Sequence, residues 1–159
     1  MLYNKTGARD FARVTLQTPP RLLVVNSKQA HNTASIVQEV AKQKHKLQET
    51  FTRIGEISVS GEQHLLEGRD IGHLITENHN LLNKLPGVSN YHTDRIVEIC
   101  NGYGVPSKIT GAGGGGVVIG LVRDAVNVDG LKRTLEKDGY QVLSEVEIGV
   151  EGVHTVEDC

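Results

Sequence analysis

The chain has 159 residues, of which 38% are hydrophobic and 23% are charged, values typical of one folded globular domain rather than of a disordered segment. With a formal net charge of −2, no footprint of a nucleic-acid-binding protein stands out in the sequence. No apolar stretch approaches the roughly 18 residues of a membrane span, and the N-terminus lacks the pattern of a secretory signal. We therefore expect neither a nucleic acid nor a membrane as partner.

The two cysteines, Cys100 and Cys159, are too few for a disulfide framework. Cys100 lies in an apolar stretch and is predicted to be a small buried hydrophobe. This use of cysteine is typical of a reducing compartment. We expect a cytoplasmic protein and leave a peroxisomal location open.

The first predicted elements are two strands and a long helix. Residues 13–17 alternate weakly, like an edge strand, and the prolines that follow end this pattern because proline has no N–H to donate. The β-branched run at 21–27 predicts a second strand. Asn32 or Thr33 can then cap a helix over roughly 33–57, because its apolar residues share one stripe. The stripe consists of Ile36, Val37, Val40, Leu47, Phe51 and Ile54.

Two more helices are predicted next. Gly61 and Gly68 interrupt the helical pattern, and Asp70 is a candidate N-cap for a second helix, which the Pro-Gly pair at 86–87 stops. Ser89 is a candidate cap for a third helix, which runs through Cys100 and ends at the glycines 102 and 104.

The C-terminal part changes to a strand-rich pattern. Residues 107–110 look extended, 117–122 form a buried-type strand, and 127–139 form an amphipathic helix. Residues 140–150 alternate as a half-buried strand, with the side chains of Val142, Ser144, Val146, Ile148 and Val150 on one face. Without the extra helices, the order is β-α-β-β-α-β. We therefore predict an α+β fold with a ferredoxin-like (split β-α-β) sheet and added helices.

Residues 111–116 hold five glycines in six positions. Three of them match the dinucleotide fingerprint G-x-G-x-x-G, but a strand rather than the required helix follows. A plain hairpin connection would need only two or three glycines, and each further glycine costs conformational entropy. We favour a loop whose backbone N–H groups approach an anion, with Lys108 and Thr110 adding a cation and a hydroxyl.

Other polar residues are interpreted as structural. No metal-binding spacing links His64, His73, His79 and His92, so we predict no metal site and assign these side chains to surface or interhelix hydrogen bonds. Asp94 and Glu98 share one helix face and are interpreted as a solvated pair rather than as an acid–base pair.

The stretch SKITGAGGGGVVIGLV resembles the third motif of the GHMP kinases, a family that includes galactokinase, homoserine kinase, mevalonate kinase and phosphomevalonate kinase. Two flanking stretches are most similar to mevalonate kinases: RLLVVNSKQAHNTASIVQEV, and LITENHNLLNKLPGVSNYHTDRIVEICNGYG. The resemblance covers about residues 15–150. It implies a GHMP kinase C-terminal domain at 21–152, preceded at 1–20 by an extension or edge strand from the interlobe region and followed by a tail at 153–159.

The resemblance also implies the chemistry. Mevalonate kinases transfer the γ-phosphoryl group of ATP to mevalonate with Mg²⁺, which requires positioning and charge neutralisation more than covalent catalysis. Thr110, Gly111, Ala112, Gly113, Gly114 and Gly115 would form the loop near the phosphates. Ala112 and Thr33 would lie near the substrate, with Asn32–Thr33 as a helix cap or as a cap that also contacts the substrate. His31 stands where an arginine is common in the family, so the resemblance does not carry over a charge contact at position 31.

The family's ATP loop, of the type P-x-G-x-G-S-S-A, is not found in this sequence, nor are the motifs of its Mg²⁺ ligand, catalytic aspartate and assisting lysine. We therefore expect a C-terminal lobe with no catalytic residue of its own, inactive as an isolated chain, and with ATP and Mg²⁺ bound mainly by the other lobe. The alternatives are another GHMP kinase, for phosphomevalonate or homoserine, or a non-catalytic binding or dimerisation module. A homodimer is left open.

Overall fold

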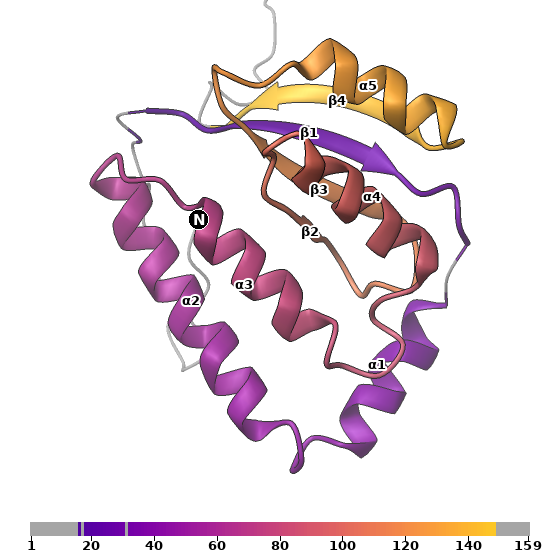
Figure 1. Cartoon of the computed structure of the whole chain (residues 1–159). Helices are drawn as coiled ribbons and strands as arrows, with labels where there is room; N and C mark the ends of the chain where they lie inside the picture. The colour runs from indigo at the N-terminus through magenta and orange to yellow at the C-terminus, as the bar shows by residue number, and fades with distance from the viewer. Residues whose placement is uncertain (1–15, 17, 31, 149–159) are drawn as a thin grey trace, which may run out of the picture.

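The computed structural model describes residues 16, 18–30 and 32–148 (Figure 1). The described part has four strands, β1 (Arg21–Asn26), β2 (Ser107–Ile109), β3 (Val117–Val122) and β4 (Gln141–Glu147). Its five helices are α1 (Thr33–Lys42), α2 (Gln48–Leu66), α3 (Gly72–Leu82), α4 (Tyr91–Gly102) and α5 (Val128–Lys137). The expected strand at 13–17 and the last residues of the expected strand at 140–150 lie outside the described residues.

The four strands form one sheet in the order β2-β3-β1-β4, and each neighbouring pair is antiparallel. This is the order of a split β-α-β sheet, so the predicted fold class is confirmed. Helices α4 and α5 cover one face of the sheet, while α2 and α3 lie side by side beyond β2 (Figure 1). Helix α1 is the first of the added helices and leads into α2.

The main core lies between the sheet and helices α4 and α5. Alternate residues of β1 and β3 point into it, since successive side chains of a strand point to opposite faces. Its fully buried members are Leu23, Val25, Ile96, Cys100, Val105, Ile109, Val118, Leu131 and Leu135. The same alternation places Leu22, Val24 and Ile119 on the opposite face, where they are half-buried.

The alternation predicted for β4 is wrong over part of the strand. The register between β1 and β4 shifts between Val24 and Val25, so Leu143 is an extra residue without a partner in the pairing. Val142 therefore pairs with Val25 on the core face, whereas Ser144 pairs with Val24 on the other face. The bulge explains why one strand sends its apolar side chains to both faces.

The single helix predicted over 33–57 is also wrong, because α1 ends at Lys42 and α2 begins at Gln48. The residues between Val40 and Leu47 are polar apart from one alanine, and most of them are exposed. A turn in this stretch lets apolar residues of both helices pack on one cluster. The cluster holds Leu47, Leu85 and Val88, with Ile36, Val40, Phe51 and Leu82 around it. Helix α2 then continues through Gly61, and only Gly68 lies beyond its end.

At two helices, the N-cap in the structure is the residue after the predicted one. Helix α3 begins after Ile71 rather than Asp70, whose carboxylate accepts hydrogen bonds from Arg123 and, at 3.3 Å, from the Gly72 N–H at the start of the helix. Helix α4 is capped by Asn90, whose side chain accepts from the Thr93 N–H in a reciprocal capping box. Ser89, the predicted cap, donates its hydroxyl to Asp94.

Candidate functional site

The glycine-rich loop joins β2 to β3, and its backbone explains its composition. Gly111, Gly113, Gly114, Gly115 and Gly116 all have a positive φ, from 71° to 147°. Side chains rarely adopt this region, so each of the five positions favours glycine. A hairpin here therefore uses five glycines, more than the two or three that the sequence argument allowed.

Two other connections hold this loop through main-chain hydrogen bonds. The Gly114 N–H donates to the Val88 carbonyl at 2.7 Å, and the Gly116 N–H donates to the Gln29 carbonyl at 3.3 Å. There is no room for side chains at the contact points. A Cβ on Gly113 would lie 2.1 Å from the Val88 carbonyl oxygen, and a Cβ on Gly115 would lie 2.7 Å from that of Gln29. The loop, the β1–α1 connection and the α3–α4 turn thus meet at one end of the sheet.

The first part of the loop keeps its N–H groups free. Within the described residues, no protein acceptor is hydrogen-bonded to the N–H of Gly111, Ala112 or Gly113. Gly111 is exposed and Ala112 is half-buried. Successive backbone N–H groups in a glycine loop can converge on an anion. The exposed start of the loop can therefore bind an anion, whereas Gly114 already donates its N–H within the protein.

The two predicted threonines lie on different elements: Thr110 directly precedes the loop, and Thr33 begins helix α1. Thr110 is exposed, and its main-chain N–H donates to the Val117 carbonyl at 3.0 Å, which closes the base of the loop. Asn32 is the cap of α1, because its side chain accepts from the Ser35 N–H at 3.1 Å. Thr33 is the first residue of the helix, is exposed, and has no cap role. It follows Gln29, the residue that contacts the loop, by four positions.

Helix α3 packs against β2 and contains two buried polar residues. Asn78 and His79 are only 7% and 5% exposed, and Asn78 Oδ1 and His79 Nδ1 have no hydrogen-bond partner among the described residues. Burial lowers the pKa of His79, nearby Asp94 raises it, and Lys108 lowers it further. Burial also lowers the pKa of half-buried Lys108.

The buried histidine should make the stability depend on pH. The pKa of His79 is lower in the folded chain than its ordinary value of 6.5, so the unfolded chain binds the proton more readily. The free energy of unfolding should therefore fall as the pH falls below about 6.5. Urea unfolding at pH 7.5, 6.5 and 5.5 measures this change.

Two histidine variants test the assignment of this pH dependence. His79→Gln should reduce it, whereas His73→Gln should keep it, because His73 is an exposed histidine of the same helix. An equal pH dependence in both variants would contradict the role of His79.

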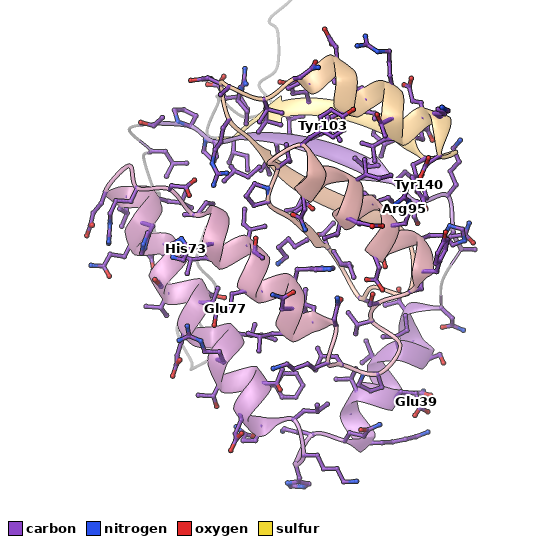
Figure 2. All side chains as sticks on the ribbon, in the orientation of Figure 1. Glu39, His73, Glu77, Arg95, Tyr103 and Tyr140 are labelled. Atoms are coloured by element: carbon purple, nitrogen blue, oxygen red, sulfur yellow. The ribbon has the colours of Figure 1, made fainter. Side chains whose placement is uncertain are left out.

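The remaining charged residues mostly form surface ion pairs. His73 and Glu77 lie on α3, and Glu77 accepts from Arg53 of α2 at 2.6 and 3.1 Å (Figure 2). Arg95 donates to Glu98 and to Asp138, so Glu98 is not paired with Asp94. Across the part of the chain that the structure describes, no group of three or more His, Cys, Asp or Glu residues could hold a metal ion. The same residues include no helix long and apolar enough to cross a bilayer.

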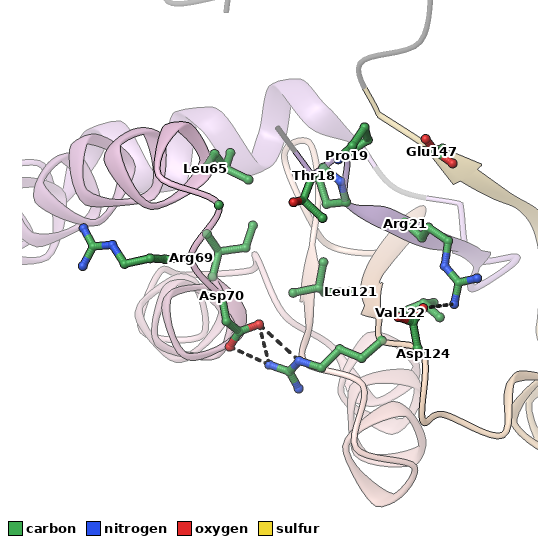
Figure 3. Close-up of a pocket in the computed structure, with 14 residues that line it drawn as sticks. Thr18, Pro19, Arg21, Leu65, Arg69, Asp70, Leu121, Val122, Asp124 and Glu147 are labelled. Atoms are coloured by element: carbon green, nitrogen blue, oxygen red, sulfur yellow. Dashed lines mark hydrogen bonds and ion pairs between the residues drawn. The ribbon is translucent and has the colours of Figure 1, made fainter. Parts of the chain in front are cut away.

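The larger of the two hollows described here lies at the other end of the sheet, where β1 begins and β3 ends (Figure 3). Its volume is about 370 Å³. Its arginines are already paired: Arg123 forms a two-pronged ion pair with Asp70 at 2.8–3.1 Å, and Arg21 lies 3.7 Å from Asp124. Among the described residues, this hollow therefore offers no unpaired arginine to a phosphate, so the glycine loop remains the candidate site.

Residues 65–141, which include the loop and the α3–α4 turn, match the family described as "GHMP kinases C terminal". The chain carries a GHMP kinase C-terminal domain. Curated relatives of this GHMP domain are mevalonate kinases. The enzyme of Methanocaldococcus jannaschii is 40% identical over 117 residues, which cover 74% of this chain and 36% of the relative. The Bos taurus enzyme is 32% identical over 157 residues, which cover 87% of this chain and 39% of the relative.

Solved structures agree with this family. The L. major mevalonate kinase in complex with R-mevalonate has a TM-score of 0.74 at 25% identity, and the match covers 90% of this chain and 46% of that one. The Methanococcus jannaschii enzyme has a TM-score of 0.69 at 35% identity, covering 81% and 40%. The Streptococcus pneumoniae phosphomevalonate kinase shares the fold, with a TM-score of 0.74 at 24% identity. The GHMP domain thus spans less than half the length of these relatives.

The sequence argument missed the residues that hold the loop from outside. Gln29 and Val88 contribute through their main chains, and nothing in the identity of either residue signals this contact. Both residues lie in stretches that resemble the family, and this resemblance is the one sequence signal that could have indicated their contact with the loop. Asn78 was not singled out either, because an asparagine on a helix is usually exposed.

Proposed function

We propose that this domain is the C-terminal lobe of an ATP-dependent kinase that phosphorylates mevalonate. The observation that carries the proposal is the glycine loop, in which the N–H groups of Gly111, Ala112 and Gly113 have no hydrogen-bond partner among the described residues. Gly111 is exposed, Ala112 is half-buried and Gly113 is buried. Free N–H groups suit phosphate oxygens, since they supply positive ends of dipoles without the bulk of side chains. The printed names of the relatives supply the substrate class.

In this proposal the residues divide by role. Gly111, Ala112 and Gly113 approach the ATP phosphates with their N–H groups, while the N–H groups of Gly114 and Gly116 fix the loop against Val88 and Gln29, with Gly115 in close contact with Gln29. Ala112 and Thr33 lie near the acceptor hydroxyl. The described residues bring no set of carboxylates to the loop, so Mg²⁺ is assigned to residues of the other lobe. The cytoplasmic location and the homodimer remain predictions.

A chimaera tests the proposal directly. It joins the part of the M. jannaschii mevalonate kinase that precedes the matched region to this whole chain, and ADP release is measured with mevalonate and MgATP. We expect turnover by the chimaera and none by this chain alone, because the ATP loop and the catalytic aspartate and lysine motifs are missing from its sequence. Thermal unfolding confirms that the chimaera is folded. A folded chimaera without activity, or robust turnover by the chain alone, would overturn the proposal.

Substitutions in the chimaera and a change of substrate extend this experiment. In the chimaera, Thr33→Val should raise the KM for mevalonate or lower kcat about ten-fold or more, while Asn32→Ala should mainly lower stability by about 1 kcal/mol. Equal kinetic effects would mean that Thr33 has no contact beyond the helix. Phosphorylation of phosphomevalonate or homoserine instead of mevalonate would favour another member of the family. If the chain binds neither nucleotide nor acceptor but forms a stable dimer, a non-catalytic module is the better assignment.

A further inference from the structure

Two histidines meet where helices α2 and α3 pack together, near the turn that joins them. His64 lies in the last turn of α2, and His73 lies in the first turn of α3 (Figure 2). Their ring centres are 5.4 Å apart, and the ring planes are inclined by 60°. Because the two residues belong to different helices, no helical spacing relates them in the sequence, and only the packing of α2 on α3 brings them together.

The hydrogen bonding of His64 leaves one of its nitrogens available for coordination. Its Nδ1 lies 2.8 Å from the main-chain carbonyl oxygen of Ser60, one turn earlier in α2. A carbonyl oxygen only accepts, so in the neutral ring Nδ1 carries the proton and Nε2 carries a lone pair. Among the described residues, Nε2 of His64 and both ring nitrogens of His73 have no hydrogen-bond partner. A metal-binding histidine usually has this arrangement, because its second nitrogen donates to a carbonyl or carboxylate that fixes the ring.

The separation of the two rings matches the spacing of two histidine ligands on one ion. Zinc binds histidine nitrogens at about 2.0–2.1 Å with tetrahedral angles, which places the centres of two imidazole ligands on the order of 5 Å apart. The observed 5.4 Å therefore lets both rings reach one ion through rotations of their side chains, without moving either helix. His64 is half-buried and His73 is exposed, so the other coordination positions are open to water.

The neighbouring carboxylates are engaged elsewhere, so the histidines would be the protein ligands. Glu77, one turn after His73, accepts two hydrogen bonds from Arg53, and Asp70 accepts those of Arg123. Imidazole nitrogen suits zinc, copper and nickel, whereas Mg²⁺ and Ca²⁺ prefer oxygen ligands. A pair of histidines therefore selects a transition metal and does not compete for the Mg²⁺ of a kinase reaction.

We propose that His64 and His73 bind one divalent transition metal ion of the zinc type, with water in its other positions. The ion would join the end of α2 to the start of α3, next to the turn that lines the larger hollow. Because the two ligands meet only when the helices are packed, the ion binds the folded chain more tightly than the unfolded one and stabilises the fold. This site does not depend on the proposed kinase function, since it lies at the opposite end of the sheet from the glycine loop.

Titration of the whole chain with ZnCl₂ tests the site, with binding measured by calorimetry and stability by thermal unfolding. We expect Zn²⁺ to raise the midpoint of unfolding and MgCl₂ to leave it unchanged. His64→Gln and His73→Gln should each weaken Zn²⁺ binding at least ten-fold. The double variant should bind about as weakly as either single variant, because each substitution already breaks the shared site. His45→Gln, which changes an exposed histidine in the α1–α2 turn, should leave binding unchanged.

A change of ligand type separates coordination from ring packing. His73→Cys removes the contact between the rings but should keep Zn²⁺ binding within about ten-fold of the native chain, because a thiolate is also a zinc ligand. The unfolding curve of each variant without metal shows that it is folded. In ¹⁵N NMR spectra of the imidazole rings, the Nε2 signal of His64 should shift on addition of Zn²⁺ while Nδ1 keeps its proton. No zinc binding, binding that survives either glutamine substitution, or equal weakening by His45→Gln would overturn the site.

Discussion

Gly113→Ala should lower the free energy of unfolding of this chain by about 3–5 kcal/mol, because two costs add at this position. Its φ is +80°, a conformation that alanine adopts only with strain. Its new methyl group would also lie 2.1 Å from the Val88 carbonyl oxygen, so the loop or the α3–α4 turn must move. Urea unfolding followed by circular dichroism measures the loss.

Gly111→Ala provides the matched control for this prediction. Its φ is +76°, nearly the same, but a Cβ there meets nothing within 4 Å. It should therefore cost only the conformational strain, about 1–2 kcal/mol. Equal losses in the two variants would show that the close contact with Val88 contributes nothing to stability.

Raising the pH from 9 to 12 should lower the stability of the chain by on the order of 4 kcal/mol through Cys100 alone. Burial raises the pKa of this thiol from 9.0 to about 12, an increase that the neighbouring Ser107 side chain opposes only in part. Below pH 9 the thiol is protonated in both states and adds no pH dependence. Between pH 9 and 12 the unfolded chain releases a proton that the folded chain keeps, so stability falls as the pH rises.

Cys100→Ala isolates this effect from other groups that titrate in the same range. Tyr140, for example, also has a pKa raised by burial and by nearby Tyr91 and Asp138, which Arg95 partly opposes. The difference in unfolding free energy between the native chain and the variant should change across pH 9–12 and be constant below pH 9. A difference that stays constant over the whole range would contradict a buried thiol at this position.

The sheet and its covering helices were predictable because their patterns are strong and local. The β-branched runs at 21–26 and 117–122 lie between clear turn signals, and the helix at 128–137 is amphipathic over its whole length. The order of these elements, more than any one of them, indicates the split β-α-β sheet. The buried Cys100 followed from the same reasoning, since it lies on the apolar side of α4.

The wrong predictions of helix length, strand face and helix cap concern places where several local structures fit the sequence and tertiary packing selects one of them. The stretch 41–46 contains no glycine or proline, so its composition does not separate one long helix from two packed helices. The bulge at Leu143 changes which face each later residue of β4 occupies, yet an extra residue leaves no trace in an alternating sequence. The cap of α4 is Asn90 rather than Ser89, and the sequence could not decide between them because both residue types cap helices about equally well.

The position of the candidate site was predictable from the sequence, but its hydrogen bonding was not, because that depends on tertiary contacts. Glycine density pointed to the loop from Gly111 to Gly116, but it does not say which N–H groups are free and which are bonded within the protein. That division depends on the carbonyls of Gln29 and Val88, which are far away in the sequence. The orphaned acceptor of Asn78 likewise becomes visible only when α3 is placed beside β2.

The contact between Gly115 and Gln29 joins two positions with opposite tolerance to mutation. Gln29 takes part through its carbonyl oxygen, which every amino acid has, and its own side chain is exposed. A substitution at residue 29 therefore keeps the acceptor of the hydrogen bond from Gly116. Gly115, with a φ of 147° and a carbonyl where its Cβ would lie, accepts no such change. A comparison of sequences that looks for pairs changing together is therefore expected to miss this contact, because only one of the two positions tolerates substitution.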